Sequence, residues 1–130
     1  MSTWSYVVPL AREHAEYLGR EGVGVPSLAP VNRAPSREDV DAAYAAIGQP
    51  DSIVVDTYAT DDGVKVAVRG APRAQLRLLH ALAARCGQLY MFGFPHDRMP
   101  GVVVDPADDL DAVMRRMDAG TRAALDAADA

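Results

Sequence analysis

A short β-hairpin signal in the middle of the chain constrains the fold most. Residues 52–60 and 64–69 are two runs rich in β-branched residues with alternating character, and Asp62 and Gly63 lie between them. An Asp-Gly pair between such runs favours a tight turn whose two central positions need a positive φ angle. We therefore predict two antiparallel strands with the centre of their turn at Asp62 and Gly63.

This turn position predicts how the two strands pair. Counting outward from it places Asp56 opposite Arg69, as a favourable cross-strand ion pair, and Tyr58 opposite Ala67. The pairing also separates an apolar face from a polar face, and a shift of one residue would mix the two. A solvated surface is one interpretation of the polar face, and a binding surface is the other. The candidate binding residues on it are Asp56, Tyr58, Lys65 and Arg69.

Capping and stop signals place the helices. Ser36 and Asp39 resemble a capping box, and Gly87 follows a strong apolar stripe. Helices are predicted at 37–47, 72–86 and 105–117, with a weaker one at 10–18. Further strands are predicted at 4–8, 89–94 and 102–104.

The order of these elements predicts an α+β fold. It reads strand, helix, strand, strand, helix, strand, which is the split β-α-β order of a ferredoxin-like domain, followed by an extra C-terminal strand and helix. In this arrangement the helices cover one face of an antiparallel sheet. We expect a single domain over residues 1–120 and a frayed, acidic, alanine-rich tail over residues 121–130.

A long connection precedes the second helix. Residues 19–35 contain three glycines and three prolines and show neither a helical nor an alternating period. A loop of this length is unusual in so small a domain. We interpret it as a flexible surface linker, with a functional loop or a strap laid across the body as alternatives.

Charge and hydropathy exclude several classes of protein. The formal net charge is −5, and residues 105–130 hold seven Asp and three Arg, so the remainder is nearly neutral. No Lys/Arg cluster with interleaved aromatic residues appears, which disfavours a nucleic-acid partner. Apolar runs are short and the N-terminus does not resemble a signal peptide, so we expect a cytoplasmic protein without a membrane partner. A single cysteine, Cys86, cannot form an internal disulfide.

No catalytic residue, metal site or cofactor is predicted. His14, His80 and His96 lack the spacing of metal ligands, and the chain has no Gly-x-Ser-x-Gly elbow. The densest polar loop is 94–101. Its imidazole, carboxylate and guanidinium could bind an anion or move a proton, whereas its two prolines and glycine also fit an exposed turn. Its candidate binding residues are His96, Asp97 and Arg98.

The predicted strand at 89–94 is apolar on both faces. Tyr90, Phe92 and Phe94 alternate with Leu89, Met91 and Gly93. Such a strand is either buried on both sides or exposes a strip of aromatic side chains. The second case would mark a surface for a partner or a ligand.

Two functions from different classes fit these patterns. The preferred one is a non-catalytic protein-binding module, such as an inhibitor or an immunity-type partner of another bacterial protein, which binds another protein or a second copy of itself. The alternative is a small cofactor-free enzyme on a ferredoxin-like dimer, of the oxygenase or isomerase type, acting on a small organic substrate. His96, Asp97, Tyr58 or Arg69 would then surround its pocket.

Overall fold

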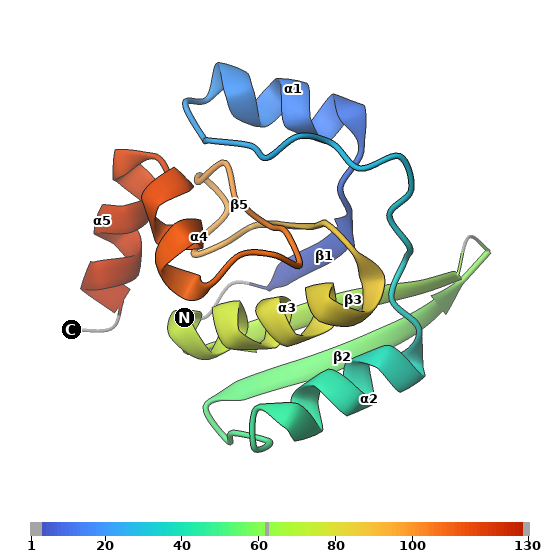
Figure 1. The fold of residues 1–130 in the computed structure, drawn as a ribbon. Coiled ribbons are helices and arrows are strands. Elements are labelled where there is room, and N and C mark those ends of the chain that lie inside the picture. The colour runs from blue at the N-terminus through green and yellow to red at the C-terminus, as the bar shows by residue number, and fades with distance from the viewer. Residues whose placement is uncertain (1–3, 62, 129–130) are drawn as a thin grey trace.

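The fold is α+β, and a five-stranded antiparallel sheet forms its centre (Figure 1). The computed structural model describes residues 4–61 and 63–128. The strands stand in the order β2-β3-β1-β4-β5, and every neighbouring pair is antiparallel. Along the described chain the elements are β1 (Ser5–Pro9), α1 (Arg12–Arg20), α2 (Arg37–Ala46), β2 (Ile53–Thr60), β3 (Gly63–Gly70), α3 (Pro72–Cys86), β4 (Leu89–Phe92), β5 (Val102–Val104), α4 (Leu110–Arg116) and α5 (Ala119–Ala128).

The β2–β3 hairpin is present, but its turn lies earlier than the sequence predicts. Thr60 pairs with Gly63, so Gly63 belongs to strand β3 and the predicted turn centre at Asp62 and Gly63 is wrong. Asp62 itself lies outside the described residues. Gly63 is the last residue of β3 to pair with β2 at the turn.

The pairing along the hairpin is therefore displaced by two residues from the predicted one. Asp56 lies opposite Ala67, and Arg69 lies opposite Val54, so the predicted cross-strand pair of Asp56 and Arg69 is wrong. Side chains in a strand alternate between faces with a period of two. A displacement of two residues consequently leaves each side chain on its predicted face, and only the neighbours change.

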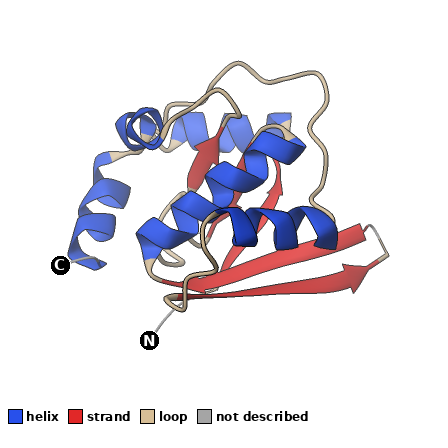
Figure 2. Cartoon of the chain, turned by 60° about the horizontal axis from the view of Figure 1, so that its bottom comes forward, coloured by secondary structure: helices blue, strands red, loops and turns tan. Residues whose placement is uncertain are grey.

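The main core lies on one face of the sheet. Helix α3 buries an apolar stripe here, and α2 lies beside it over the long hairpin (Figures 1 and 2). Val66, Val68 and Met91 supply the strand side of this core and are almost fully buried. Helix α3 spans the predicted residues 72–86. Pro72 lies in its first turn, where proline is favoured, and Gly87 follows its last residue, where glycine is favoured.

The opposite face is also covered, but only over part of the sheet. Leu18 of α1 packs with Val23, Tyr90 and Val103 in a second apolar cluster. Tyr90 and Val103 belong to strands β4 and β5, and their neighbours along those strands point into the main core. The two main helices, α2 and α3, cover one face as expected, but the expectation that all helices lie on that face is wrong, because Leu18 of α1 packs on the opposite face.

The acidic C-terminal region forms a packed helix. Helix α5 spans Ala119–Ala128, and its Thr121 and Leu125 are fully buried. Leu125 joins the main core together with Val113 and Met117 of the α4 region. This differs from the expected frayed tail, because one leucine among the alanines provides enough apolar surface to anchor the helix.

Helix α4 begins later than the sequence predicts. Asp109 is its N-cap and accepts a hydrogen bond from the backbone N–H of Ala112 at 2.7 Å. The preceding acids form a turn instead, in which the carboxylate of Asp108 accepts from the backbone N–H of Asp105 at 2.9 Å. Several aspartates in a row offer several possible caps, and packing of the helix decides between them.

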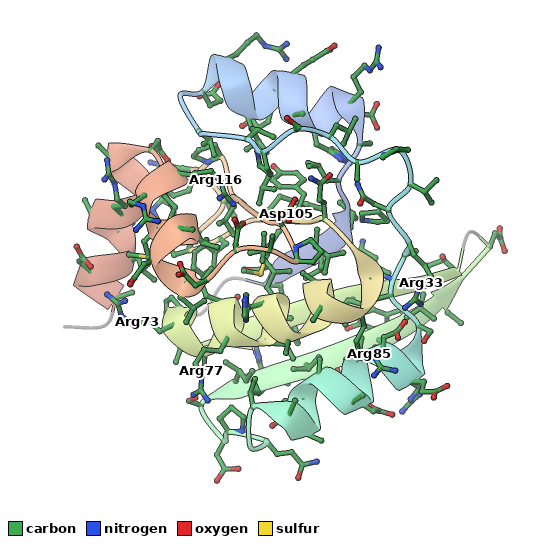
Figure 3. All side chains as sticks on the ribbon, in the orientation of Figure 1. Arg33, Arg73, Arg77, Arg85, Asp105 and Arg116 are labelled. Carbon is green, nitrogen blue, oxygen red and sulfur yellow. The ribbon has the colours of Figure 1, made fainter. Side chains whose placement is uncertain are left out.

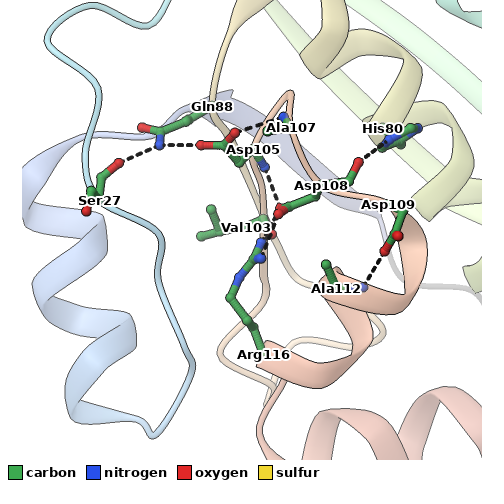
Figure 4. Close-up of polar contacts among 10 residues, drawn as sticks. All are labelled: Ser27, His80, Gln88, Val103, Asp105, Ala107, Asp108, Asp109, Ala112 and Arg116. Atoms are coloured by element: carbon green, nitrogen blue, oxygen red, sulfur yellow. Dashed lines mark hydrogen bonds and ion pairs between the residues drawn. The ribbon is translucent and has the colours of Figure 1, made fainter.

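Residues 21–35 form a strap across the body instead of a flexible linker. The side chain of Gln88, only 2% exposed, holds the strap: its amide donates to Ser27 O and to Asp105, each at 2.7 Å (Figure 4), and its carbonyl accepts from Ala29 N at 2.8 Å. Asn32 Oδ1 accepts from Gln88 N at 2.9 Å. Of the alternatives open from sequence, the strap is the one that the structure shows.

The end of the strap is joined to α2 and α3 through one buried carboxylate. Asp39 is 4% exposed and accepts hydrogen bonds from Arg33 at 2.5 Å, from Arg85 at 3.1 Å and from the Ser36 backbone at 2.9 Å. The two arginines lie near each other where α2 begins (Figure 3). Hydrogen bonding from Arg33, helped by Ser36 and Arg85, holds the pKa of Asp39 far below its usual range. Burial raises the pKa of the neighbouring Cys86 thiol to about 11, which keeps it protonated.

Candidate binding face

One part of the second sheet face has no cover among the described residues. Helix α1 and the strap lie over β4 and β5, whereas no described helix lies below the long β2–β3 hairpin in Figure 2. Val54 is 43% exposed and Tyr58 49%, which is high for large side chains in a sheet. We call this surface the open face; it consists of Trp4, Tyr6, Val54, Asp56, Tyr58, Lys65, Arg69 and Phe92.

Strand pairing brings the members of the open face together from four segments of the chain. Tyr6 of β1 lies opposite both Ala67 of β3 and Phe92 of β4. The Tyr6 and Phe92 rings stack with centroids 5.5 Å apart. Phe92 also lies 5.7 Å from Tyr90, so the aromatic row continues under α1. Residues more than 80 positions apart thus form one continuous aromatic strip.

Two cations lie over rings of this strip. The ammonium of Lys65 is 4.5 Å from the centre of the Tyr6 ring, and the guanidinium of Arg69 is 4.8 Å from the centre of the Trp4 ring. Both distances fall within the range of cation–π attraction. The rings restrict where the two charged groups lie, so a partner would meet charges that are already partly positioned.

The open face holds one acid. The Tyr58 hydroxyl donates to Asp56 at 3.4 Å, a long contact on the same strand. Removal from water and the adjacent Asp56 raise the pKa of Tyr58 above its ordinary value, so the hydroxyl remains a donor at neutral pH. With two cations and one anion the face is locally positive, although the whole chain carries a net charge of −5.

Sequence reasoning found half of this face. Asp56, Tyr58, Lys65 and Arg69 all lie on it, because the alternation of the hairpin assigns the faces correctly. Phe92 was expected on a partner surface only in the case that its strand exposes an aromatic strip. The remaining three members were not predicted as binding residues: Trp4, Tyr6 and Val54. Tyr6 and Trp4 alternate with Ser5 and Val7 in the first strand, and this pattern is the signal that could have found them.

The aromatic alternation of the predicted strand 89–94 has a mixed outcome. Tyr90 is buried under α1, Phe92 is 36% exposed on the open face, and Phe94 is fully buried in the main core. Strand β4 ends at Phe92, and Gly93 follows with a φ of 76°. This left-handed turn redirects the chain, so Phe94 does not share the face of Phe92.

The loop that carries His96, Asp97 and Arg98 exposes Asp97 and Arg98, whereas His96 is half-buried and the ends of the loop at Phe94 and Pro100 are buried. Its first residues include a cis peptide bond between Phe94 and Pro95. His96 Nδ1 accepts from Arg98 N at 3.3 Å, and His96 O accepts from Met99 N at 3.0 Å. These hydrogen bonds stay within the turn, and the loop contributes no member to the open face.

The other histidines have structural contacts. His14 Nδ1 accepts from Ala11 N at 3.0 Å and so caps α1, and the His80 ring nitrogen Nε2 lies 2.6 Å from Asp108 O (Figure 4). Burial alone would raise the pKa of Asp108, but hydrogen bonds from Arg116 and the backbone N–H of Asp105 outweigh it and lower the pKa. Within the described ranges, no three His, Cys, Asp or Glu side chains gather as a metal site would require.

Comparison with protein-family models, curated proteins and solved structures gave no match. Over the part of the chain that the structure describes, no helix combines the length and hydrophobicity needed to cross a bilayer. The open face thus combines exposed aromatic rings with two cations that lie over them.

Proposed function

We propose that this protein is a non-catalytic binding module that recognises another protein through its open face. The observation that carries the proposal is the aromatic strip with Lys65 and Arg69 held over its rings. Tyr, Trp, Phe and Arg are the residues enriched in the energetically important centres of protein interfaces. Action as an inhibitor or an immunity-type partner of another bacterial protein belongs to this proposal, because such a role requires binding alone.

The fold assignment that accompanies this proposal is the ferredoxin-like arrangement. The order β2-β3-β1-β4, with all neighbours antiparallel, supports it, since a split β-α-β unit places its first strand between its third and fourth. Strand β5 and helices α4 and α5 then form the C-terminal extension. In such a sheet one face is free for binding unless another element covers it, and here α1 covers only part of it.

The proposed partner presents carboxylates to this face. Lys65 and Arg69 are exposed and outnumber the single Asp56, so an acidic surface complements them. Single-stranded nucleic acid is also negative and can stack on aromatic rings. It is the less favoured occupant, because two cations on a chain of net charge −5 neutralise few phosphates.

Charge reversal on the open face tests the proposal. The wild-type chain and the double variant Lys65→Glu/Arg69→Glu are each immobilised and exposed to a lysate of the source cells. A protein captured by the wild type is purified and titrated against both chains by calorimetry. We expect the face variant to lose at least about tenfold in affinity, since it replaces two attractive contacts by repulsive ones.

The matched control is Arg98→Glu/Arg122→Glu, which makes the same change in net charge at two exposed positions outside the open face. It should bind like the wild type. Loss of binding in the control with retention in the face variant would move the site to the His96 loop or to α5. Binding of a single-stranded oligonucleotide that is lost only in the face variant would replace the protein partner by a nucleic acid.

A further inference from the structure

The two edges of the sheet differ strongly. Strand β5 has three residues, all buried, whereas β2 has eight and pairs only with β3 among the described strands. An edge strand exposes unpaired backbone N–H and C=O groups, and proteins usually protect it with charges, proline, a bulge or a short length. Strand β2 is long, lacks proline and carries one charged residue, Asp56. Over residues 53–59 its outer edge is therefore open to pairing with another strand.

A groove follows this edge. It has a volume of about 450 Å³ and runs between β2 and helix α2. The strand supplies Val55 and Thr57, both half-buried, and the helix supplies Val40 and Tyr44. Apolar side chains beside an unpaired strand edge are the combination used when a second chain extends a sheet.

The two charges that α2 contributes to the groove are self-complementary, and β2 adds a third charged residue, Asp56, to the lining. Arg37 and Asp41 line it from α2, one helical turn apart, and both are exposed. A two-fold axis would place a second α2 antiparallel to the first. Arg37 of each copy would then face Asp41 of the other, so one cation and one anion give two favourable contacts.

We propose that two copies of this chain associate along β2, which joins their sheets, with the two α2 helices facing each other across the groove. Main-chain hydrogen bonds along β2 supply the common ladder, and the reciprocal charges of Arg37 and Asp41 select the antiparallel arrangement. The groove shares Val54 and Asp56 with the open face, whereas Lys65, Arg69 and the aromatic rings under them lie outside it. The association depends on the strand edge and on the charges of α2, and not on Lys65 and Arg69, so the two proposals can fail separately.

Light scattering coupled to gel filtration measures the association directly. The wild type should elute with twice the mass of one 13.9 kDa chain at sufficient concentration and dissociate on dilution. Arg37→Asp and Asp41→Arg should each raise the dimer dissociation constant at least about tenfold, because each creates two like-charge contacts. The swap Arg37→Asp/Asp41→Arg should restore the wild-type constant. Glu38→Arg, exposed on the same helix but outside the groove, serves as the control and should not change it.

A second variant tests the strand. Thr57→Lys places a charge on the edge strand, and it should abolish the dimer while circular dichroism confirms an intact fold. A chain that stays monomeric at all protein concentrations up to about 1 mM overturns the proposal. Its dimer dissociation constant would then exceed about 1 mM, which corresponds to very weak binding. A dimer that withstands Thr57→Lys, or that responds equally to Glu38→Arg and Asp41→Arg, also overturns it.

Discussion

At the scale of single residues, Asp39 has the most demanding environment. It is almost fully buried and accepts hydrogen bonds from two arginines and from its own helix cap. We expect Asp39→Asn to lower the free energy of unfolding by about 1 to 3 kcal/mol, because a buried network loses its charge and two guanidinium groups lose their partner. Urea denaturation measures this change. Glu38→Gln, exposed on the same helix turn, should stay within about 0.5 kcal/mol.

The contribution of Asp39 should depend on pH with a defined sign. Its pKa is lowered in the folded state, so between the two pKa values the unfolded chain binds more protons. The stability that Asp39 provides is thus fully present above its unfolded pKa of about 4 and is lost as the pH falls below that value. The stability difference between wild type and Asp39→Asn should shrink from pH 6 to pH 2. A difference that is constant over this range would show that the carboxylate charge is not what stabilises the junction.

At the scale of elements, the sequence predicts where helices begin and end better than it predicts which elements pack against each other. The capping box of Ser36 and the limits of α3 are local signals, and the structure confirms them. The hairpin register depends on where the turn closes, which the Asp-Gly signal placed one residue too late. The face covered by α1 depends on partners distant in the chain, namely Tyr90 and Val103. Gln88 shows the same limit: nothing in its local sequence indicates that its amide ties the strap to the body.

The packing of helix α5 on the main core should contribute measurably to stability. Leu125 is fully buried in the main core, whereas Leu28 in the strap is 38% exposed. Leu125→Ala should lower the free energy of unfolding by about 2 to 4 kcal/mol, because it leaves a cavity, and Leu28→Ala should cost much less. Thermal or urea denaturation measures the stability of both variants. Because both replace leucine by alanine, the two results differ only through the surroundings of the side chain. Equal, small effects would mean that α5 is not anchored in the core and that the frayed tail expected from the sequence at residues 121–130 is the better description.

At the scale of the whole molecule, the open face arises from what the helices leave uncovered. Alternation in the hairpin predicted Asp56 and Tyr58 on one face, but the aromatic strip requires knowing that β1 lies between β3 and β4. Tyr6 and Phe92 stack across that arrangement although they are 86 positions apart. Strand order is a property of the complete sheet, so a single strand cannot reveal such a site.

The same strand order links the two cores and predicts how the molecule unfolds. Strands β1 and β4 contribute Val7 and Met91 to the main core and Val8 and Tyr90 to the cluster under α1, so one layer cannot separate without exposing the other. Urea transitions followed by the fluorescence of the only tryptophan, Trp4, and by far-ultraviolet circular dichroism should coincide at constant protein concentration. Leu18→Ala in α1 should shift both midpoints together with unchanged slopes. Loss of helical signal before Trp4 responds would show that α1 and its cluster form a separate, weaker unit laid on an independent sheet.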